Sequence, residues 1–480
     1  MKAVAYMRLG EQKNCVALHT SESCILPIQK GGWYQITDPT KVAVDLWLEI
    51  LKDNPDDLTS MFLLNVAYMN LGQYPDGVPA QYRINPEEFK STYDVGKFKN
   101  IAGDLGIDFI TTSGGVCVED FNNDGNLDII ASGWLLNEQV KVMFNNGDGT
   151  FKDVTETSTL KGITGGLDMK CADYNNDGWM DVLIPRGAWW NDFGKLPASL
   201  LRNNGDGTFT DVTYETGLME HLYPTQSSVF ADFNNDGWLD IYFGNETRRD
   251  TEKYPCELFI SDGKGKFKNA GKDSGAGILC FAKGVAASDY NNDGYMDICI
   301  SSQGTENFLL RNDTGKNGGK IKFTDVTKEA GVGLPIKSFP VAFLDYNNDG
   351  WEDLTIMTYD AEHCDYDNAA EYFNKPVKGE YSILYCNNGD GTFTDVTKEM
   401  HMNVAMTVMG LSFGDIDNDG WLDIYSGTGT PNYTSLVPKR MFRNNEGKGY
   451  QDVTHSGGFG HLQKGHGIGF GDVDNDGDQD

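Results

Sequence analysis

A nine-residue acidic phrase recurs seven times along the chain, and its residue types suit a hard divalent cation. The first copy runs from Asp120 through Gly125 to Asp128, and every copy has Asp at positions 1 and 9 and Gly at position 6. Side-chain oxygens at positions 1, 3, 5 and 9, with the backbone carbonyl of position 7, can surround a calcium ion, while the Gly permits a sharp turn. We therefore predict up to seven Ca²⁺ sites.

The seven loops share this outline and differ mainly at positions 3 and 7. Position 3 is Asn in five loops and Asp in the last two, and position 7 contributes its backbone carbonyl. The predicted calcium ligands, in chain order, are Asp120, Asn122, Asp124, Asn126, Asp128, Asp173, Asn175, Asp177, Trp179, Asp181, Asp232, Asn234, Asp236, Trp238, Asp240, Asp289, Asn291, Asp293, Tyr295, Asp297, Asp345, Asn347, Asp349, Trp351, Asp353, Asp415, Asp417, Asp419, Trp421, Asp423, Asp472, Asp474, Asp476, Asp478 and Asp480.

Single Asn-Asn-Asp-Gly clusters are often only polar turns. A turn requires no acid at positions 1 and 9, however, and all seven copies have both. An EF-hand is excluded, because it needs Glu at position 12 and a helix after it. The residues after Asp128, Asp240 and Asp297 are instead rich in β-branched and aromatic types, which predict strands. Each loop is therefore expected to join two β-strands.

A second repeated phrase alternates with the loops and completes a four-stranded unit. Residues 149–155, 207–213 and 391–397 are its clearest copies, and a hairpin precedes each one. The first Asp residues of successive loops are 53 to 70 residues apart, and four strands in a repeat of this length are typical of a propeller blade. We predict an all-β, seven-bladed β-propeller, whose last blade is incomplete at the C-terminus and combines residues 97–102 with 467–480.

The first 90 residues differ in kind from the repeats. Residues 40–52 and 58–71 place apolar side chains at helical spacing, and Pro55 lies between them. This pattern resembles tetratricopeptide repeats, although a small helical cap with no partner of its own is the alternative. We divide the chain into a helical tetratricopeptide-like segment with its linker at 1–90, and a calcium-binding propeller at 91–480.

The loops and the Gly-Thr-Phe-Thr-Asp-Val-Thr phrases resemble the FG-GAP (VCBS-type) repeats of integrin alpha-subunit propellers. Together with the tetratricopeptide-like segment, they are similar to bacterial relatives of cartilage acidic protein. The resemblance covers residues 96–480 closely and residues 1–90 loosely. It implies a secreted, calcium-binding propeller with a role in binding or cell adhesion, and an ASPIC/UnbV domain on the C-terminal side of the propeller.

A ligand-binding surface is expected on the side of the propeller opposite the calcium loops, which we call the insert face. In an antiparallel blade the next chain reversal lies on that side, and there the connections vary in length. These inserts contain Trp189, Trp190, Tyr366 and Tyr433, which we predict as ligand-face residues because variable loops on a rigid scaffold commonly bind ligands. The alternative is that these rings only pack the inserts.

Composition excludes other classes of protein. A formal charge of −32 without a basic stripe argues against nucleic acid as a partner. No apolar run approaches the roughly 20 residues that span a bilayer. Residues 1–10 do not form a secretory signal. The cysteine count of nine is odd, and Cys15 and Cys24 could form a disulfide in an oxidising compartment.

The sequence contains neither a His-Glu-x-x-His zinc motif nor a Gly-x-Ser-x-Gly nucleophile elbow. The leading hypothesis is a non-catalytic, calcium-stabilised propeller, located outside the cell, on its surface or in the periplasm, that binds protein or glycan ligands. The alternative is a carbohydrate-active lyase or hydrolase that uses the same insert face. A weaker alternative gives the helical segment a protein partner.

Overall fold

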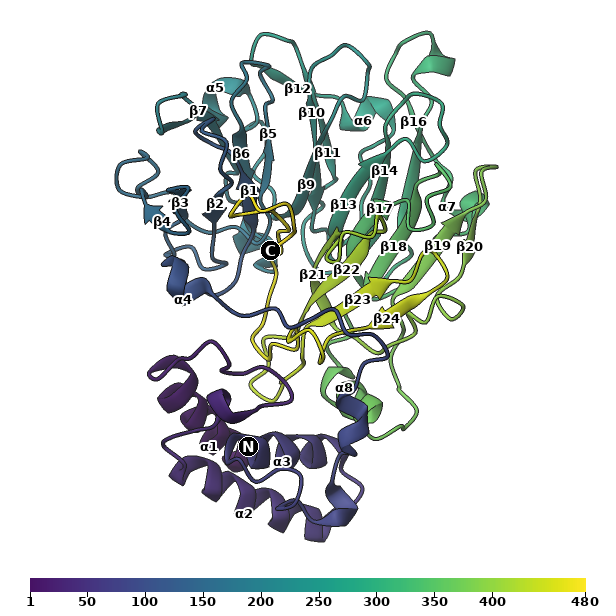
Figure 1. The fold of residues 1–480 in the computed structure, drawn as a ribbon. Coiled ribbons are helices and arrows are strands. Elements are labelled where there is room, and N and C mark those ends of the chain that lie inside the picture. The colour runs from purple at the N-terminus through teal and green to yellow at the C-terminus, as the bar shows by residue number, and fades with distance from the viewer.

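The computed structural model describes residues 1–480 and contains six four-stranded sheets that follow an N-terminal group of helices (Figure 1). In each sheet the strands pair in chain order and antiparallel, so that each blade is a meander. The first strands of successive blades contact one another and are therefore innermost. The all-β propeller and the helical segment before it are confirmed.

The strands are short, and the fourth strand of every blade has only three residues. Blade 1 contains β1 (Val116–Glu119), β2 (Asp128–Ala131), β3 (Lys141–Asn145) and β4 (Phe151–Asp153). Blade 2 contains β5 (Lys170–Ala172), β6 (Asp181–Ile184), β7 (Ser199–Asn203) and β8 (Phe209–Asp211). Blade 3 contains β9 (Thr225–Ala231), β10 (Asp240–Asn245), β11 (Glu257–Ser261) and β12 (Phe267–Asn269).

Blade 4 contains β13 (Ala282–Ser288), β14 (Asp297–Ser302), β15 (Phe308–Asn312) and β16 (Phe323–Asp325). Blade 5 contains β17 (Ser338–Leu344), β18 (Asp353–Thr358), β19 (Ile383–Asn387) and β20 (Phe393–Asp395). Blade 6 contains β21 (Val408–Gly414), β22 (Asp423–Thr428), β23 (Arg440–Asn444) and β24 (Tyr450–Asp452). In all six blades the second strand begins at position 9 of an acidic loop, so the loop joins the first two strands as predicted.

The predicted seventh blade is wrong, because the propeller has six sheets and neither 97–102 nor 467–480 contains a strand. Phe98 donates one backbone hydrogen bond to Gly457 (2.9 Å), too little for a ladder. The C-terminal residues are rich in Gly, which weakens a strand. They also pack against the faces of neighbouring strands, since a Cβ on Gly469 would lie 2.6 Å from Val118 Cγ2.

Residues 467–480 lie between the first and last blades. Figure 1 shows this yellow segment running from the side of β21 and β22 to the side of β1. A Cβ on Gly467 would lie 2.9 Å from Val116 N in β1, and Phe470 packs against Gly414 in β21. The segment therefore fills the space between β1 and β21 without adding a sheet.

The N-terminal helices form a separate layer beneath blades 5 and 6 (Figure 1). Helices cover the predicted ranges 40–52 and 58–71, except that the second helix ends at Asn70. The long helices are α1 (Lys2–Glu11), α2 (Asp38–Asp53) and α3 (Leu58–Asn70). Shorter turns are η1 (Gln12–Val16), η2 (Lys30–Gly32), η3 (Ala80–Tyr82) and η4 (Pro86–Phe89). None of the helices has the length and apolar character that crossing a bilayer requires. Cys15 and Cys24 are free thiols.

One-turn helices lie before β1 and in connections between the propeller strands. They are α4 (Ala102–Leu105), α5 (Thr213–Thr216), η5 (Asn191–Gly194), α6 (Gly271–Ser274), η6 (Gly315–Asn317) and α7 (Thr327–Ala330). The longest insert forms α8 (Cys364–Tyr372), which packs against α3. Ala369, Ala370 and Tyr372 of α8 belong to the same hydrophobic core as the N-terminal helices. This blade 5 insert therefore attaches the helical layer to the propeller.

The aromatic contact between α8 and the helical segment predicts a local effect of mutation. The ring of Tyr372 lies 5.3 Å from that of Phe62 and 5.5 Å from that of Phe89. Tyr372→Ala should weaken the attachment by about 3 kcal/mol, as for other buried aromatic truncations. Limited trypsin digestion followed by mass spectrometry should then release residues 1–90 faster. Tyr433→Ala, at a ring that is 75% exposed, is the control, and equal cleavage of the two variants would contradict the prediction.

Candidate metal sites and the insert face

The seven acidic loops have the same backbone shape. Position 4 is Asn in every loop, with φ between +54° and +60°, and the position-6 Gly has φ between +85° and +97°. Both values lie in the left-handed region, which Gly adopts without strain and Asn tolerates better than most residues. The loops therefore turn back on themselves within nine residues.

The position-1 carboxylate fixes the tip of each loop. One of its oxygens accepts the N–H of position 5 and the other accepts the N–H of position 6, as Asp173 does from Asp177 (3.0 Å) and Gly178 (2.8 Å). The same two bonds occur in all seven loops. The acid at position 1 thus positions the backbone as well as offering oxygens to a cation.

The position-9 carboxylate lies inside the blade. In the six loops that precede a second strand it is fully buried, whereas Asp480 is exposed. One oxygen accepts the backbone N–H of the last residue of the third strand, as Asp353 does from Asn387 at 2.7 Å. Equivalent bonds of 2.6–2.8 Å occur in the other five blades. This acid is therefore held at the base of the loop, facing the acids at positions 1 and 5.

Burial raises the pKa of the position-9 carboxyls. The pKa reaches about 7 for Asp128, Asp181, Asp240, Asp353 and Asp423, and about 8 for Asp297. The acids at positions 1 and 5, or 3 and 5 in the loop of Asp423, also raise this pKa, while the backbone hydrogen bonds lower it. A carboxylate in such a place requires a nearby positive charge to stay ionised at neutral pH.

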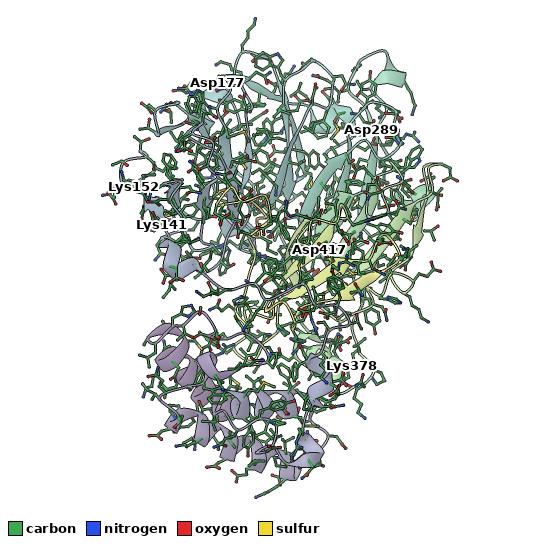
Figure 2. The ribbon with its side chains drawn as sticks, in the orientation of Figure 1. Lys141, Lys152, Asp177, Asp289, Lys378 and Asp417 are labelled. Carbon is green, nitrogen blue, oxygen red and sulfur yellow. The ribbon has the colours of Figure 1, made fainter.

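Several loop oxygens have no protein partner. Asp181 Oδ2 and Asp417 Oδ1 are buried without a hydrogen bond, and both belong to predicted ligands. Oxygens of Asp415, Asp417 and Asp423 lie within 4.8 Å of one another, as do those of Asp472, Asp474 and Asp480. Figure 2 shows Asp177, Asp289 and Asp417 in three separate loops of the propeller. An all-oxygen donor set of this size fits Ca²⁺, so the residues present are compatible with the predicted ion.

The loop of blade 6 has a buried cation, whereas the cation at the blade 4 loop, Lys316 beside Asp293 at 3.5 Å, is exposed. Arg443 Nε donates to Asp417 Oδ2 at 2.7 Å, and its Nη2 pairs with Asp419. Arg443 lies on β23, and the ring of Tyr93 covers its guanidinium at 4.1 Å. The two acids at positions 3 and 5 of this loop are thus already partly neutralised.

The position-4 Asn is the residue that the sequence predictions missed. Its side-chain Nδ2 donates to the carbonyl oxygen of the position-6 Gly in the next loop around the propeller, over N to O distances of 2.7–3.4 Å. The last of these bonds runs from Asn475 back to Gly125. The signal was present, because all seven loops have Asn at position 4.

Trp189 lies at the insert-face end of the central channel rather than on an open surface. Its ring packs against Phe281 (5.5 Å), Phe339 (6.0 Å) and Tyr359 (5.7 Å). The ammonium group of Lys283 lies 3.2 Å from the centre of the Trp189 ring. Below this cluster is a channel cavity of about 150 Å³, lined by the first strands of the blades.

The other three predicted ligand-face residues lie in separate places. Trp190 is half-buried and contacts Trp134 at 5.8 Å. Tyr366 packs on the helical segment, under the ammonium of Lys378 at 3.6 Å, and Figure 2 shows Lys378 beside the helical layer. Tyr433 is exposed, while its carbonyl oxygen accepts a hydrogen bond from Arg8 of α1. The insert face is thus partly occupied by the helical segment.

A larger groove, of about 580 Å³, lies beside the blade 3 insert. The rings of His221 and Tyr223 stack at 5.0 Å, only 4° from parallel. His221 Nδ1 lies 2.8 Å from Glu257 Oε1, which also accepts a hydrogen bond from Asn269. Sequence reasoning missed this group because His221 and Glu257 are 36 residues apart and belong to no motif.

Six meander blades with one acidic loop each define a β-propeller of internal repeats. The FG-GAP-like repeat family matches residues 120–184, 188–243, 289–356 and 377–426. These ranges include the acidic loops of all six blades. The chain therefore contains FG-GAP-like repeats, as the repeated phrases predicted.

The chain is also similar to known proteins at low identity. Human cartilage acidic protein 1 is 24% identical over 275 residues, covering 56% of this chain and 40% of that protein. The Xenopus tropicalis protein of the same name is 24% identical over 50% of this chain and 36% of its own length. A T-cell immunomodulatory protein homolog of Plasmodium yoelii yoelii is 22% identical over 64% of this chain and 43% of that protein. The chain thus spans about two fifths of these relatives.

Among solved structures, one described as BBS1N in complex with ARL6DN aligns with a TM-score of 0.39 and 9% identity. The alignment covers 70% of this chain and 81% of that chain.

Proposed function

We propose that the protein is a calcium-stabilised, non-catalytic propeller that acts outside the cell or on its surface and binds glycan or protein ligands through its insert face. The observation that supports the calcium sites most directly is the shared geometry of the loops. All seven loops have the same backbone shape, and in the last two the carboxylate oxygens at positions 1, 3 and 9 lie within 4.8 Å of one another. Converging carboxylates repel one another strongly unless a cation lies between them.

The ligand would bind on the insert face, where the groove of blade 3 offers suitable chemistry. The outer face of the His221 ring is a flat apolar platform, since the side chain is 42% exposed and Tyr223 covers its other face. Asn269 beside it is half-buried and can exchange hydrogen bonds with hydroxyl groups, while the buried Glu257 holds His221 in place. A sugar ring needs both features, so we assign glycans to this groove and protein contacts to the region of Trp190.

Calcium binding and ligand binding can be tested separately. Equilibrium dialysis of the full chain with ⁴⁵Ca²⁺ should give several ions per chain, and magnesium at the same concentration should not displace them. A glycan array should then identify ligands, and His221→Ala should reduce binding by about tenfold, or 1.4 kcal/mol. Tyr214→Ala, at a ring that is 84% exposed and outside the groove, is the matched control.

Three outcomes would each reject a part of this function. A chain that binds fewer than one calcium ion would reject the metal sites. Cleavage of a bound glycan, detected by new reducing ends, would favour the carbohydrate-active enzyme instead. His221→Ala with unchanged glycan binding would exclude the groove as the ligand site.

A further inference from the structure

The bonds between neighbouring loops continue into the predicted ligands of the next loop. The position-6 carbonyl that accepts the Asn amide belongs to the same peptide group as the N–H of position 7. That N–H donates to the position-5 Asp of its own loop. Between blades 1 and 2, Asn123 Nδ2 lies 3.1 Å from Gly178 O, and Trp179 N lies 3.0 Å from Asp177 Oδ1.

This two-bond relay occurs at every junction between loops. The bonds from position 7 to position 5 measure 2.9–3.2 Å in all seven loops. A hydrogen bond accepted at one end of a peptide group polarises it and strengthens the bond donated at the other end. Each loop is thereby connected to a predicted carboxylate ligand of the next loop. The relay from Asn475 through Gly125 to Asp124 connects the last loop to the first, so the relays form a closed ring.

We propose that this ring of side-chain amides couples the loops, so that a cation bound at one loop raises the affinity of its neighbours. The proposal rests on the calcium binding proposed above. A cation fixes the tip of its loop, which holds the adjacent Asn in its donating position and orders the next loop before that loop binds. The second ion then loses less conformational entropy. Repulsion between ions in neighbouring loops opposes this effect, but the three or four carboxylates of each loop offset the charge of its ion.

Substitution of one Asn by Gly tests the ring without straining the backbone. Asn292 has φ of +54°, which Gly adopts freely, so Asn292→Gly removes only the amide that bonds Gly350. The chelator-treated full chain is titrated with CaCl₂ by isothermal titration calorimetry. We expect a Hill coefficient above 1 for the unmodified chain. In the variant, the calcium affinity of the flanking loops should be about fivefold lower, which is the lower end of the range typical for coupling between sites.

Hydrogen exchange locates the effect. In Asn292→Gly, protection of peptides spanning residues 345–353 from exchange should require a higher calcium concentration than in the unmodified chain. No residue of that loop differs between the two chains. Asn388→Ala is the matched control, because its Nδ2 bonds only Thr392 within its own hairpin, at 2.9 Å. Asn176→Gly tests a second junction should Asn292→Gly fail to fold.

The outcomes separate the coupling from the calcium sites. Normal calcium binding with a Hill coefficient of 1, or with the same curve in Asn292→Gly as in the unmodified chain, would overturn the coupling and leave the proposed function intact. A chain that binds no calcium would overturn both.

Discussion

Removal of calcium with excess EDTA should lower the melting temperature of this protein by about 10 °C or more. A ligand present at 100 times its Kd stabilises the folded state by about 2.7 kcal/mol per site. Only the folded loops bring their oxygens together, so several such contributions add. The position-9 acids strengthen the expectation, because without a cation each buried carboxylate must either be protonated or remain unpaired.

Differential scanning calorimetry in calcium, in EDTA, and in EDTA followed by excess calcium measures the effect. The third sample should recover the first melting temperature, which shows that EDTA acts through calcium. Magnesium should restore much less, because it demands a smaller, octahedral set of ligands. A change of less than about 1 °C would contradict calcium stabilisation, since even one saturated site should exceed it.

The sequence predicted the repeating unit because a blade is a local structure. Acidic loop, hairpin and strand phrases recur in order, and each strand pairs with the next along the chain. Blade number is different, since it depends on how distant segments pack. Residues 467–480 repeat the loop phrase, but their Gly-rich approach lies between β1 and β21 without a ladder. Counting phrases therefore overestimated the number of sheets.

The candidate ligands were predictable for the same local reason, whereas contacts between blades were not. Position 4 looked like an ordinary turn residue, and only the fold shows that Asn123 reaches Gly178, 55 residues away. The four predicted aromatic rings also depended on distant contacts. Trp189 meets residues of blades 4 and 5, while Tyr366 meets the helical segment. Spacing along the chain carries no information about such neighbours.

Glu246→Ala should destabilise the propeller by about 3–5 kcal/mol, because the buried Lys283, without its counterion, must either remain an unpaired cation or lose its proton. The side chains of Glu246 and Lys283 are 1% and 0% exposed and form an ion pair near the insert-face end of the channel. The second Glu246 oxygen accepts the backbone N–H of Trp189 at 2.8 Å, so this bond is lost as well. Chemical denaturation by urea measures the change in unfolding free energy.

The loss of unfolding free energy in Glu246→Ala should increase as the pH falls below about 7. Burial lowers the pKa of Lys283 to about 7, and Glu246 partly opposes that shift, so removal of Glu246 lowers the pKa further. In the variant the unfolded chain then binds a proton that the folded chain does not, and acid favours unfolding over a wider range. The charge of the neighbouring Arg248 also lowers the pKa of Lys283, and burial lowers the pKa of His466, which faces the same channel, to about 4.

Two further variants distinguish loss of the counterion from loss of packing. Glu246→Gln with Lys283→Met removes both charges and keeps the volume, so it should recover most of the stability. Glu252→Ala, on the same insert as Glu246, breaks an exposed ion pair with Lys195 of the blade 2 insert and should leave the urea midpoint unchanged. If Glu246→Ala were as stable as Glu252→Ala at pH 6, the pair would not hold the channel mouth together. The position of Trp189 above Lys283 would then depend only on packing against its aromatic neighbours.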